Sequence, residues 1–189
     1  MDDDRRRWDD RYRGAPPAAA AVEPEAVSSR PDLCELIPTS GQALDIACGS
    51  GSTTLWLARR GLTVLALDVS PRAIDLVGQA ARAAGVAVRV TAKAVDLDGG
   101  LPADAREVDV IVCQRFRDPS LYPTFVERLR PGGIGIVTVL SVVGLVDTPG
   151  AFHAPPGELL TAFDRGDAEV LHERETDGVA SIVFRRSAC

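Results

Sequence analysis

Strand-like and helix-like segments alternate along most of this chain, and this alternation restricts the folds open to it. A short apolar run at 42–48 precedes a helix-like segment at 52–61, which ends in glycine. A second apolar run follows at 62–69, and Ser70 with Pro71 has the pattern of an N-cap and a first helical residue. Near-continuous apolar strands between helices are typical of a parallel sheet that is covered on both faces. The sequence therefore predicts an open, doubly wound α/β sheet with its ligand site at the carboxyl ends of the strands.

The last part of the chain departs from this alternation. The strand-like segments 168–175 and 179–186 are separated by the turn Thr176-Asp177-Gly178, which predicts an antiparallel hairpin at one side of the sheet. The predicted strands are 42–48, 62–69, 86–95, 109–113, 134–140, 168–175 and 179–186, and the predicted helices are 52–61, 71–84, 118–130 and 157–164. We expect a mostly parallel, seven-stranded sheet. Residues 1–31, rich in Ala and Pro, predict an arm or linker with one short helix, and residues 32–189 one domain.

Composition argues against several classes of protein. The 189 residues suffice for one ordinary domain, and 21 basic against 27 acidic residues give a formal charge of −6, which would repel a nucleic-acid backbone. The longest apolar run, 134–146, is interrupted and too short for a transmembrane helix. The charged N-terminus has no apolar stretch like that of a secretory signal. We expect a cytoplasmic protein that binds neither nucleic acid nor membrane.

Cysteine and histidine positions argue against a metal centre. The cysteines are Cys34, Cys48, Cys113 and Cys189. They form no CxxC pair, and His153 and His172 are not spaced with them as metal ligands would be. We expect reduced thiols and no bound metal.

One strand-to-helix turn carries the chemical signal. Asp45 lies near the end of an apolar strand and is followed by the small residues Ala47-Cys48-Gly49-Ser50-Gly51 before a helix begins. Glycines in such a turn let a ligand approach the backbone, and amides at a helix start favour an anionic group. Asp68 ends the next strand, 23 residues after Asp45, where a carboxylate can accept hydrogen bonds from both ribose hydroxyls of an adenosine. Together these features predict a nucleoside site.

The glycine pattern bears on which nucleoside cofactor the site accepts. A dinucleotide site favours a third glycine three residues beyond the second, and Thr54 stands there. Asp45 would also repel a pyrophosphate placed beside this turn. A cofactor with a cationic end suits the site better.

These residues resemble the class I S-adenosylmethionine-dependent methyltransferases, and among them the small tellurite-resistance-like and thiopurine-methyltransferase-like branch. The resemblance covers roughly residues 8–186 and rests on five motifs: WDDRY from Trp8, LDIACGSG, ALDVSPRAI, Val95-Asp96-Leu97 and LRPGG. It implies S-adenosyl-L-methionine as cofactor and a seventh strand inserted antiparallel. The candidate cofactor-binding residues are Trp8, Tyr12, Asp45, Ala47, Cys48, Gly49, Gly51, Asp68, Val69, Asp96 and Leu97.

The resemblance also implies individual roles for these residues. The loop from Asp45 to Gly51 would wrap the methionine moiety, with the Ala47 carbonyl near its ammonium group, and Asp68 would bind the ribose. Val69 would pack on the adenine, whose edge Asp96 and the Leu97 amide would contact. Ala47 replaces the first glycine of the family loop, and Ser52-Thr53 stands where tellurite-type relatives often have Arg-Asn. The loop after the fifth strand has no long lid insertion, which predicts a small or open acceptor pocket.

Several of these residues have structural alternatives. Asp45 could be satisfied by nearby backbone amides, and Asp68 and Asp96 could be helix caps or turn formers. Trp8 and Tyr12 lie four residues apart, so they could close over the cofactor or pack the arm onto the domain.

Two residues are candidates for the acceptor side and hence for catalysis. Arg115 follows the fourth strand and could clamp an anionic acceptor, more plausibly than Arg117; both could equally be solvated. His153, in the loop after the fifth strand, could act as a general base or be an ordinary loop histidine.

The function we expect is in-line methyl transfer from S-adenosyl-L-methionine to a small-molecule acceptor. Because the sequence offers no convincing base, a soft or anionic nucleophile is favoured. One alternative is a non-catalytic S-adenosylmethionine-binding sensor or partner subunit, and another is a nicotinamide-dependent oxidoreductase, which Asp45 and Thr54 disfavour.

Overall fold

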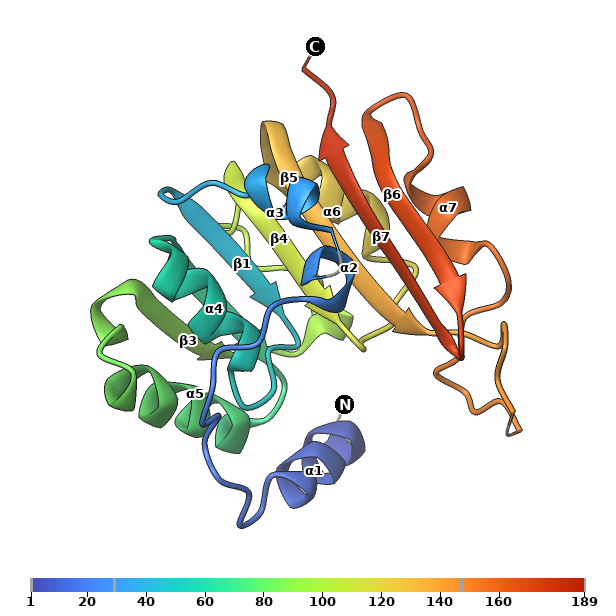
Figure 1. The fold of residues 1–189 in the computed structure, drawn as a ribbon. Coiled ribbons are helices and arrows are strands. Elements are labelled where there is room, and N and C mark those ends of the chain that lie inside the picture. Colours follow the sequence, from blue (N-terminus) through green and yellow to red (C-terminus); the bar gives the residue numbers. More distant parts are fainter. Residues whose placement is uncertain (1, 29, 147, 189) are drawn as a thin grey trace. The chain divides into compact units, whose positions relative to one another are not determined.

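The computed structural model describes residues 2–28, 30–146 and 148–188 (Figure 1). The chain forms two compact units, each assembled from two stretches of sequence. The first unit comprises Met1–Glu23 and Pro38–Ala105, and the second comprises Pro24–Ile37 and Arg106–Cys189. The predicted division into an arm at 1–31 and a domain at 32–189 stays a prediction.

The first unit is a parallel sheet with helices packed against it. Its elements are α1 (Asp2–Arg11), β1 (Gln42–Ile46), α4 (Ser52–Arg60), β2 (Thr63–Asp68), α5 (Pro71–Ala83), η1 (Ala87–Arg89), β3 (Val90–Ala94) and η2 (Leu97–Gly99). Strand β2 pairs in parallel with both β1 and β3, so the strands run in the order β3-β2-β1. Helices α4 and α5 contact each other and both contact β2, which places them on one face of this sheet.

The helices of the first unit begin and end where sequence chemistry requires. The Ser70 hydroxyl accepts a hydrogen bond from the Ala73 amide at 3.1 Å, so the predicted N-cap of α5 is confirmed. Helix α4 ends at Gly61, whose φ of 110° is accessible to glycine at little cost, and a Cβ there would lie 2.1 Å from the Thr39 carbonyl oxygen.

Residues 12–23 pack against the rest of the first unit. Ala18 and Ala21 contact a buried cluster that includes Leu55 and Ala80, and the Val22 amide donates to the Ser52 carbonyl at 3.0 Å. Sequence analysis predicted one short helix within 1–31, whereas the structure has the ten-residue α1 and the short α2 (Glu25–Ser28).

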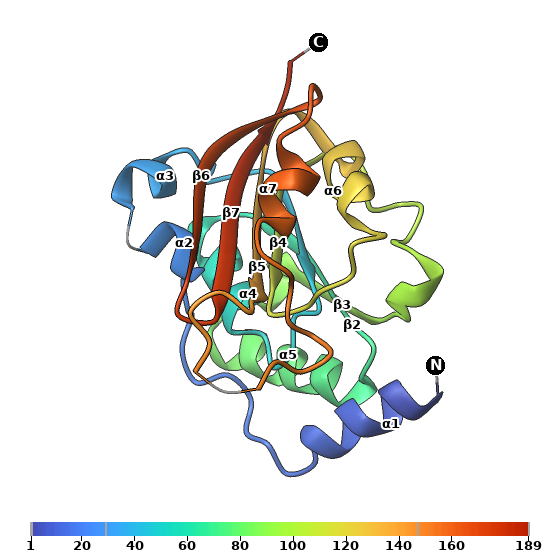
Figure 2. The ribbon, with the colours of Figure 1, turned by 90° about the vertical axis from the view of Figure 1, so that its right-hand side faces the viewer.

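The second unit holds the remaining strands and its own helices. Its elements are α2 (Glu25–Ser28), α3 (Pro31–Glu35), β4 (Val108–Gln114), α6 (Tyr122–Arg128), β5 (Leu129–Leu140), α7 (Glu158–Phe163), β6 (Ala168–Thr176) and β7 (Val179–Arg186). Strand β4 is parallel to β5, and β7 lies between β5 and β6 and is antiparallel to both. Figure 2 shows α2 and α7 on opposite faces of β6 and β7.

An aromatic cluster fills the α6 and α7 face of the second unit. The Phe163 and Phe184 rings stack with centroids 4.3 Å apart, and Tyr122 packs 5.3 Å from Phe163. Gly135 on β5 makes room for this cluster, because a Cβ there would lie 2.1 Å from the Phe184 ring. The Phe184 ring thus lies closer to the backbone at position 135 than a residue with a Cβ would permit.

The predicted fold class is confirmed. The sheet has seven strands in the order β3-β2-β1-β4-β5-β7-β6, mostly parallel with antiparallel pairing at its C-terminal strands. The largest differences from the predicted boundaries lie at β3, α6 and β5, which begin at Val90, Tyr122 and Leu129 instead of at 86, 118 and 134. Strand β3 begins after the 3₁₀ turn η1. Leu129 and Arg130, predicted as the end of a helix, belong to β5, and Pro131 disfavours helical backbone at Arg130.

Several predicted absences concern only the residues that the structure describes. None of their helices is long and apolar enough to cross a membrane, and no group of His, Cys, Asp and Glu among them could hold a metal ion. Cys34, Cys48 and Cys113 are not in disulfide bonds, and Cys189 lies outside the described residues.

Candidate active site

Asp68 is fixed at the carboxyl end of β2 by two backbone amides. Its two carboxylate oxygens accept hydrogen bonds from the Gly49 and Ser70 amides, each at 2.9 Å. The side chain is 6% exposed, and burial raises its pKa, while these amide hydrogen bonds oppose the rise. The Gly49 bond ties the glycine turn after β1 to the end of β2.

Asp45 is the second buried carboxylate of this site. It is 1% exposed, and the Thr54 hydroxyl donates to its Oδ2 at 2.5 Å. Burial raises the pKa of Asp45 to about 7; the Thr54 hydrogen bond opposes this rise, and the nearby Asp68 charge adds to it. Thr54, which replaces the third glycine of a dinucleotide turn, therefore has a positive role as the partner of Asp45.

The turn between β1 and α4 adopts left-handed backbone at three positions. Ala47 has φ 54°, Gly49 φ 55° and Gly51 φ 96°. Ala47 stands where the family resemblance implies glycine, and an alanine in this conformation carries about 1 kcal/mol of strain. At Gly51 the available space also favours glycine, since a Cβ there would lie 3.1 Å from the Val77 side chain.

Tyr12, the residue directly after helix α1, lies at this turn. A Cβ on Gly49 would lie 2.8 Å from the Tyr12 hydroxyl, so this side chain lies against the glycine turn. Burial, together with the Asp68 charge, raises the pKa of Tyr12 to about 12. The Trp8 and Tyr12 rings stack with centroids 6.3 Å apart, and the Arg7 and Arg11 guanidinium groups lie 5.6 and 5.5 Å from the Trp8 ring centroid.

An acidic side chain anchors α1 to the start of α5. The Asp9 carboxylate accepts hydrogen bonds from the Ser70 hydroxyl and from the Arg72 amide, the latter at 3.3 Å. A carboxylate at a helix N-terminus is favoured by the unpaired amides and by the helix dipole. Sequence analysis missed Asp9, because the contact joins residues 61 positions apart and the neighbouring Asp10 is an equal candidate by type.

The residues expected to contact the adenine lie beyond β2 and β3. Val69 is half-buried, and Leu97 is 6% exposed at the start of η2. Asp96 caps η2, with its Oδ1 accepting from the Asp98 amide at 3.1 Å. Capping was the structural alternative for Asp96, and it is compatible with the predicted adenine contact because a carboxylate has further lone pairs.

The predicted cofactor residues all belong to the first unit, and their chemistry fits S-adenosylmethionine. Two buried carboxylates, Asp45 and Asp68, favour a ligand with positive groups, which the sulfonium and ammonium of this cofactor provide. The glycine turn supplies a surface without side chains. Cys48, 9% exposed, packs with Ala66 and Val77, so its side chain is part of the core.

The two predicted acceptor-side residues belong to the second unit. Arg115 is exposed, has φ 59°, and donates its amide to the Thr138 carbonyl at 2.7 Å. His153 is half-buried, and its Nδ1 accepts from the Gly150 amide at 3.0 Å. Their catalytic roles stay predictions.

Arg117 has a structural partner. Its guanidinium Nε and Nη2 both bond the Glu158 carboxylate, at 2.9 and 2.5 Å, and the Tyr122 hydroxyl donates to the same carboxylate at 3.1 Å. This bidentate pair holds the start of α7, which agrees with the lower expectation of an acceptor role for Arg117.

Comparison with known proteins finds a matching family and similar proteins for part of the chain. Residues 43–133 match the family described as "Methyltransferase domain". The chain is 33% identical over 126 residues to a 2-heptyl-1-hydroxyquinolin-4(1H)-one methyltransferase of Mycobacteroides abscessus, covering 64% of this chain and 52% of the relative. It is 34% identical over 119 residues to a ubiquinone biosynthesis O-methyltransferase of Cereibacter sphaeroides, covering 58% and 46%. The chain thus spans about half the length of these curated relatives.

A solved structure shares the fold. TehB from Haemophilus influenzae superposes with a TM-score of 0.69 at 19% identity, covering 85% of this chain and 62% of TehB. At this identity the likeness concerns the fold and does not assign a branch of the family. The matched segment contains β1 from Ala43 onward, the glycine turn, Asp68 and Asp96. Residues 43–133 therefore match a methyltransferase domain, and the cofactor that this similarity supports is S-adenosyl-L-methionine.

Proposed function

We propose that this chain transfers the methyl group of S-adenosylmethionine to a small-molecule acceptor with a soft or anionic nucleophile. The observation that carries the proposal is the Asp68 carboxylate, buried at the end of β2 and held by the Gly49 and Ser70 amides beside the glycine turn. A carboxylate so fixed can accept hydrogen bonds from ribose hydroxyls without reorganising.

The chain's own residues would bind and orient the cofactor. When bound, S-adenosylmethionine supplies an electrophilic methyl carbon, whose bond to sulfur breaks as the acceptor's lone pair forms the new bond. Asp45 and the turn to Gly51 would surround the methionine moiety, and Asp68 would hold the ribose. Tyr12 would exclude water from the glycine turn. Fixing both reactants in line is the main contribution that a protein makes to such a reaction.

The names of the two relatives agree with an acceptor of acidic hydroxyl type. One acts on a hydroxyquinolinone, and the other is an O-methyltransferase of ubiquinone biosynthesis. An acidic hydroxyl yields an oxyanion near neutral pH and needs little help from a base. Within this proposal Arg115 would attract the acceptor's negative charge, and His153 would take a residual proton. Membership of the tellurite-resistance-like or thiopurine-methyltransferase-like branch is part of the same proposal.

Calorimetric titration tests the cofactor assignment. We expect micromolar binding of S-adenosylmethionine and none of NAD, and we expect Asp68→Asn to weaken binding by at least about ten-fold, the loss of one hydrogen bond to a charged group. Asp75→Asn, an exposed change of the same kind on α5, is the matched control. Failure to bind S-adenosylmethionine would remove the proposed function.

A second experiment, on the reaction products, distinguishes catalysis from cofactor binding alone. Mass spectrometry of a phenol and thiol panel should detect a mass increase of one methylene and formation of S-adenosylhomocysteine. A sensor or a partner subunit is the second candidate, because the loop after the fifth strand has no long lid insertion and Ser52-Thr53 stands where tellurite-type relatives often have Arg-Asn. Tight cofactor binding with no product from any acceptor would favour that candidate.

A further inference from the structure

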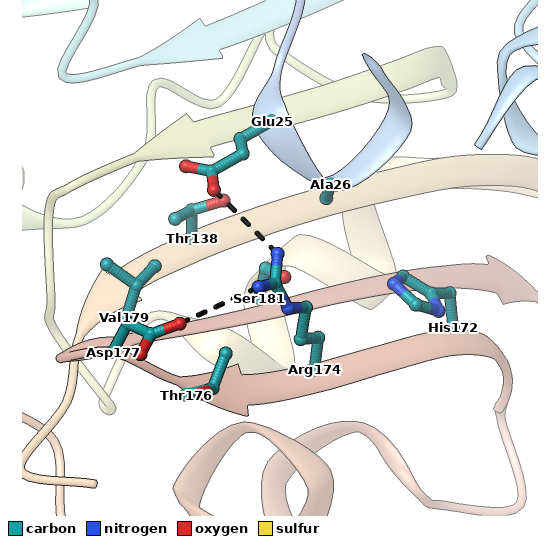
Figure 3. Close-up of a pocket in the computed structure, with 9 residues that line it drawn as sticks. All are labelled: Glu25, Ala26, Thr138, His172, Arg174, Thr176, Asp177, Val179 and Ser181. Atoms are coloured by element: carbon teal, nitrogen blue, oxygen red, sulfur yellow. Dashed lines mark ion pairs between the residues drawn. The ribbon is translucent and has the colours of Figure 1, made fainter. Parts of the chain in front are cut away.

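A cavity of about 110 Å³ lies beside α2 in the second unit, and the described residues that line it include none of the predicted cofactor-binding or acceptor-side residues (Figure 3). Side chains from α2, β5, β6, β7 and the turn between β6 and β7 line it. Those used below are Glu25, Thr138, Arg174, Asp177 and Ser181. The inference drawn from this cavity does not depend on methyl transfer.

Strand register places three polar side chains in one row on the floor of the cavity. Thr138 on β5 lies opposite Ser181 on β7, and Ser181 lies opposite Arg174 on β6. Directly opposed residues in neighbouring strands project from the same face of the sheet. Figure 3 shows the three side chains on this face. The row crosses a sheet whose other face is covered by the aromatic cluster of Phe163 and Phe184.

The Thr138 hydroxyl points to a ligand. Thr138 is 3% exposed, and its Oγ1 has no hydrogen-bond partner among the residues that the structure describes. Buried hydroxyl groups are almost always hydrogen-bonded, since an unpaired one costs free energy. Ser181, 7% exposed, is its cross-strand neighbour. The inner end of the cavity therefore offers two neutral hydroxyl groups to a bound molecule.

Charged groups of both signs form the outer end. The Arg174 guanidinium lies 4.0 Å from the Glu25 carboxylate and 3.8 Å from the Asp177 carboxylate. Both distances exceed the 2.7–3.2 Å usual for hydrogen bonds, so these are ion pairs held by charge alone. A ligand carboxylate can therefore bond the guanidinium directly, and a ligand cation can bond either carboxylate.

The arrangement of charges selects among ligand classes. A simple anion would meet Arg174 but also two carboxylates, and a simple cation would meet the carboxylates but also Arg174. A molecule with an ammonium and a carboxylate a few ångströms apart pairs with both kinds of group. The volume equals roughly three or four water molecules at about 30 Å³ each, which is enough for a small amino acid.

We propose that this cavity binds a small zwitterion of amino-acid type that carries a hydroxyl group. Its carboxylate bonds the Arg174 guanidinium, its ammonium bonds the Glu25 carboxylate, and its hydroxyl bonds Thr138 Oγ1 and the Ser181 hydroxyl. No covalent step is involved.

Calorimetry on the full chain tests the charge requirement, with L-serine as the probe. We expect a Kd of about 1 mM, a weak affinity appropriate to so small a ligand. Glycerate lacks the ammonium and ethanolamine lacks the carboxylate, and both should bind at least about ten-fold more weakly. Absence of L-serine binding, or equal binding of either analogue, would overturn the proposal.

Variants test the assigned contacts. Arg174→Gln should abolish measurable L-serine binding, and Arg185→Gln, a change at a partly exposed residue of β7 that pairs with Glu169, should leave it unchanged. Thr138→Val should weaken L-serine several-fold and leave L-alanine, which has no hydroxyl, unaffected. Equal weakening of both ligands by Thr138→Val, or full affinity in Arg174→Gln, would contradict the assignment. If Thr138→Val does not fold by circular dichroism, Ser181→Ala makes the same comparison.

Discussion

Replacing the buried Asp45 by asparagine should stabilise the ligand-free protein by an amount that depends on pH. Burial raises the pKa of this carboxyl from its ordinary value of 3.8 to about 7, and the side chain is 1% exposed. The unfolded chain therefore releases the proton more readily than the folded protein does. Stability falls as pH rises from about 4 to about 7 and changes no further above that range, because a raised carboxyl pKa favours folding only while the group is protonated. Asparagine removes this loss and can still accept the Thr54 hydrogen bond.

The size of the effect follows from the two pKa values. At 1.36 kcal/mol for each tenfold change in proton affinity, wild-type protein loses up to about 4 kcal/mol at pH 8 and only about 1 to 2 kcal/mol at pH 5. The advantage of Asp45→Asn should therefore be about 3 kcal/mol larger at pH 8 than at pH 5.

Urea unfolding of the ligand-free protein at both pH values measures this difference. With a slope of roughly 2 kcal/mol/M, it corresponds to a change of about 1.5 M in the relative unfolding midpoint. Asp75→Asn, exposed on α5, should show no such dependence. An advantage of equal size at both pH values would refute the reasoning. The stabilised variant should at the same time lose affinity for S-adenosylmethionine, since it lacks one of the two proposed anionic groups.

Three further changes test other parts of the molecule. Phe163→Ala, which removes the ring stacked on Phe184, should lower the free energy of unfolding by about 3–5 kcal/mol in urea titrations. Ala47→Gly should raise it by up to about 1 kcal/mol, because glycine relieves the left-handed backbone; unchanged or lower stability would contradict the strain. Asp9→Ala should release α1, seen as faster tryptic cleavage within α1 and several-fold weaker S-adenosylmethionine binding. Equal cleavage rates in Asp9→Ala and wild type would show that the Ser70 contact does not hold α1.

The fold could be predicted because its signals are local. Apolar runs of strand length, the Ser70-Pro71 start and the Thr176-Asp177-Gly178 turn each act over a few residues, and all three agree with the structure. Boundaries were less predictable where tertiary pairing decides them. Leu129 and Arg130 carry a helix-compatible sequence, yet they pair as the start of β5, and the coming Pro131 removes the helical alternative.

The candidate site could be predicted in part for the same reason. Asp45, Gly49 and Asp68 belong to turns with strong local patterns, and the structure links Gly49 to Asp68 through a hydrogen bond. Contacts between distant segments could not be foreseen. Asp9 forms a hydrogen bond with Ser70, 61 residues away, and Thr138 lies opposite Ser181 only because of the strand register. Neither pair is therefore indicated by a pattern in the local sequence.

The insertion of β7 between β5 and β6 has a consequence for synthesis. Strand β5 reaches its antiparallel neighbour only after residues 179–186 have left the ribosome, so the nascent chain exposes a long edge rich in Ile and Val while 141–178 are translated. Such edges invite pairing with other chains. Translation that stops before Val179 should therefore yield aggregates instead of a shortened folded protein, and a chaperone that shields β5 during this interval should raise the yield of folded protein.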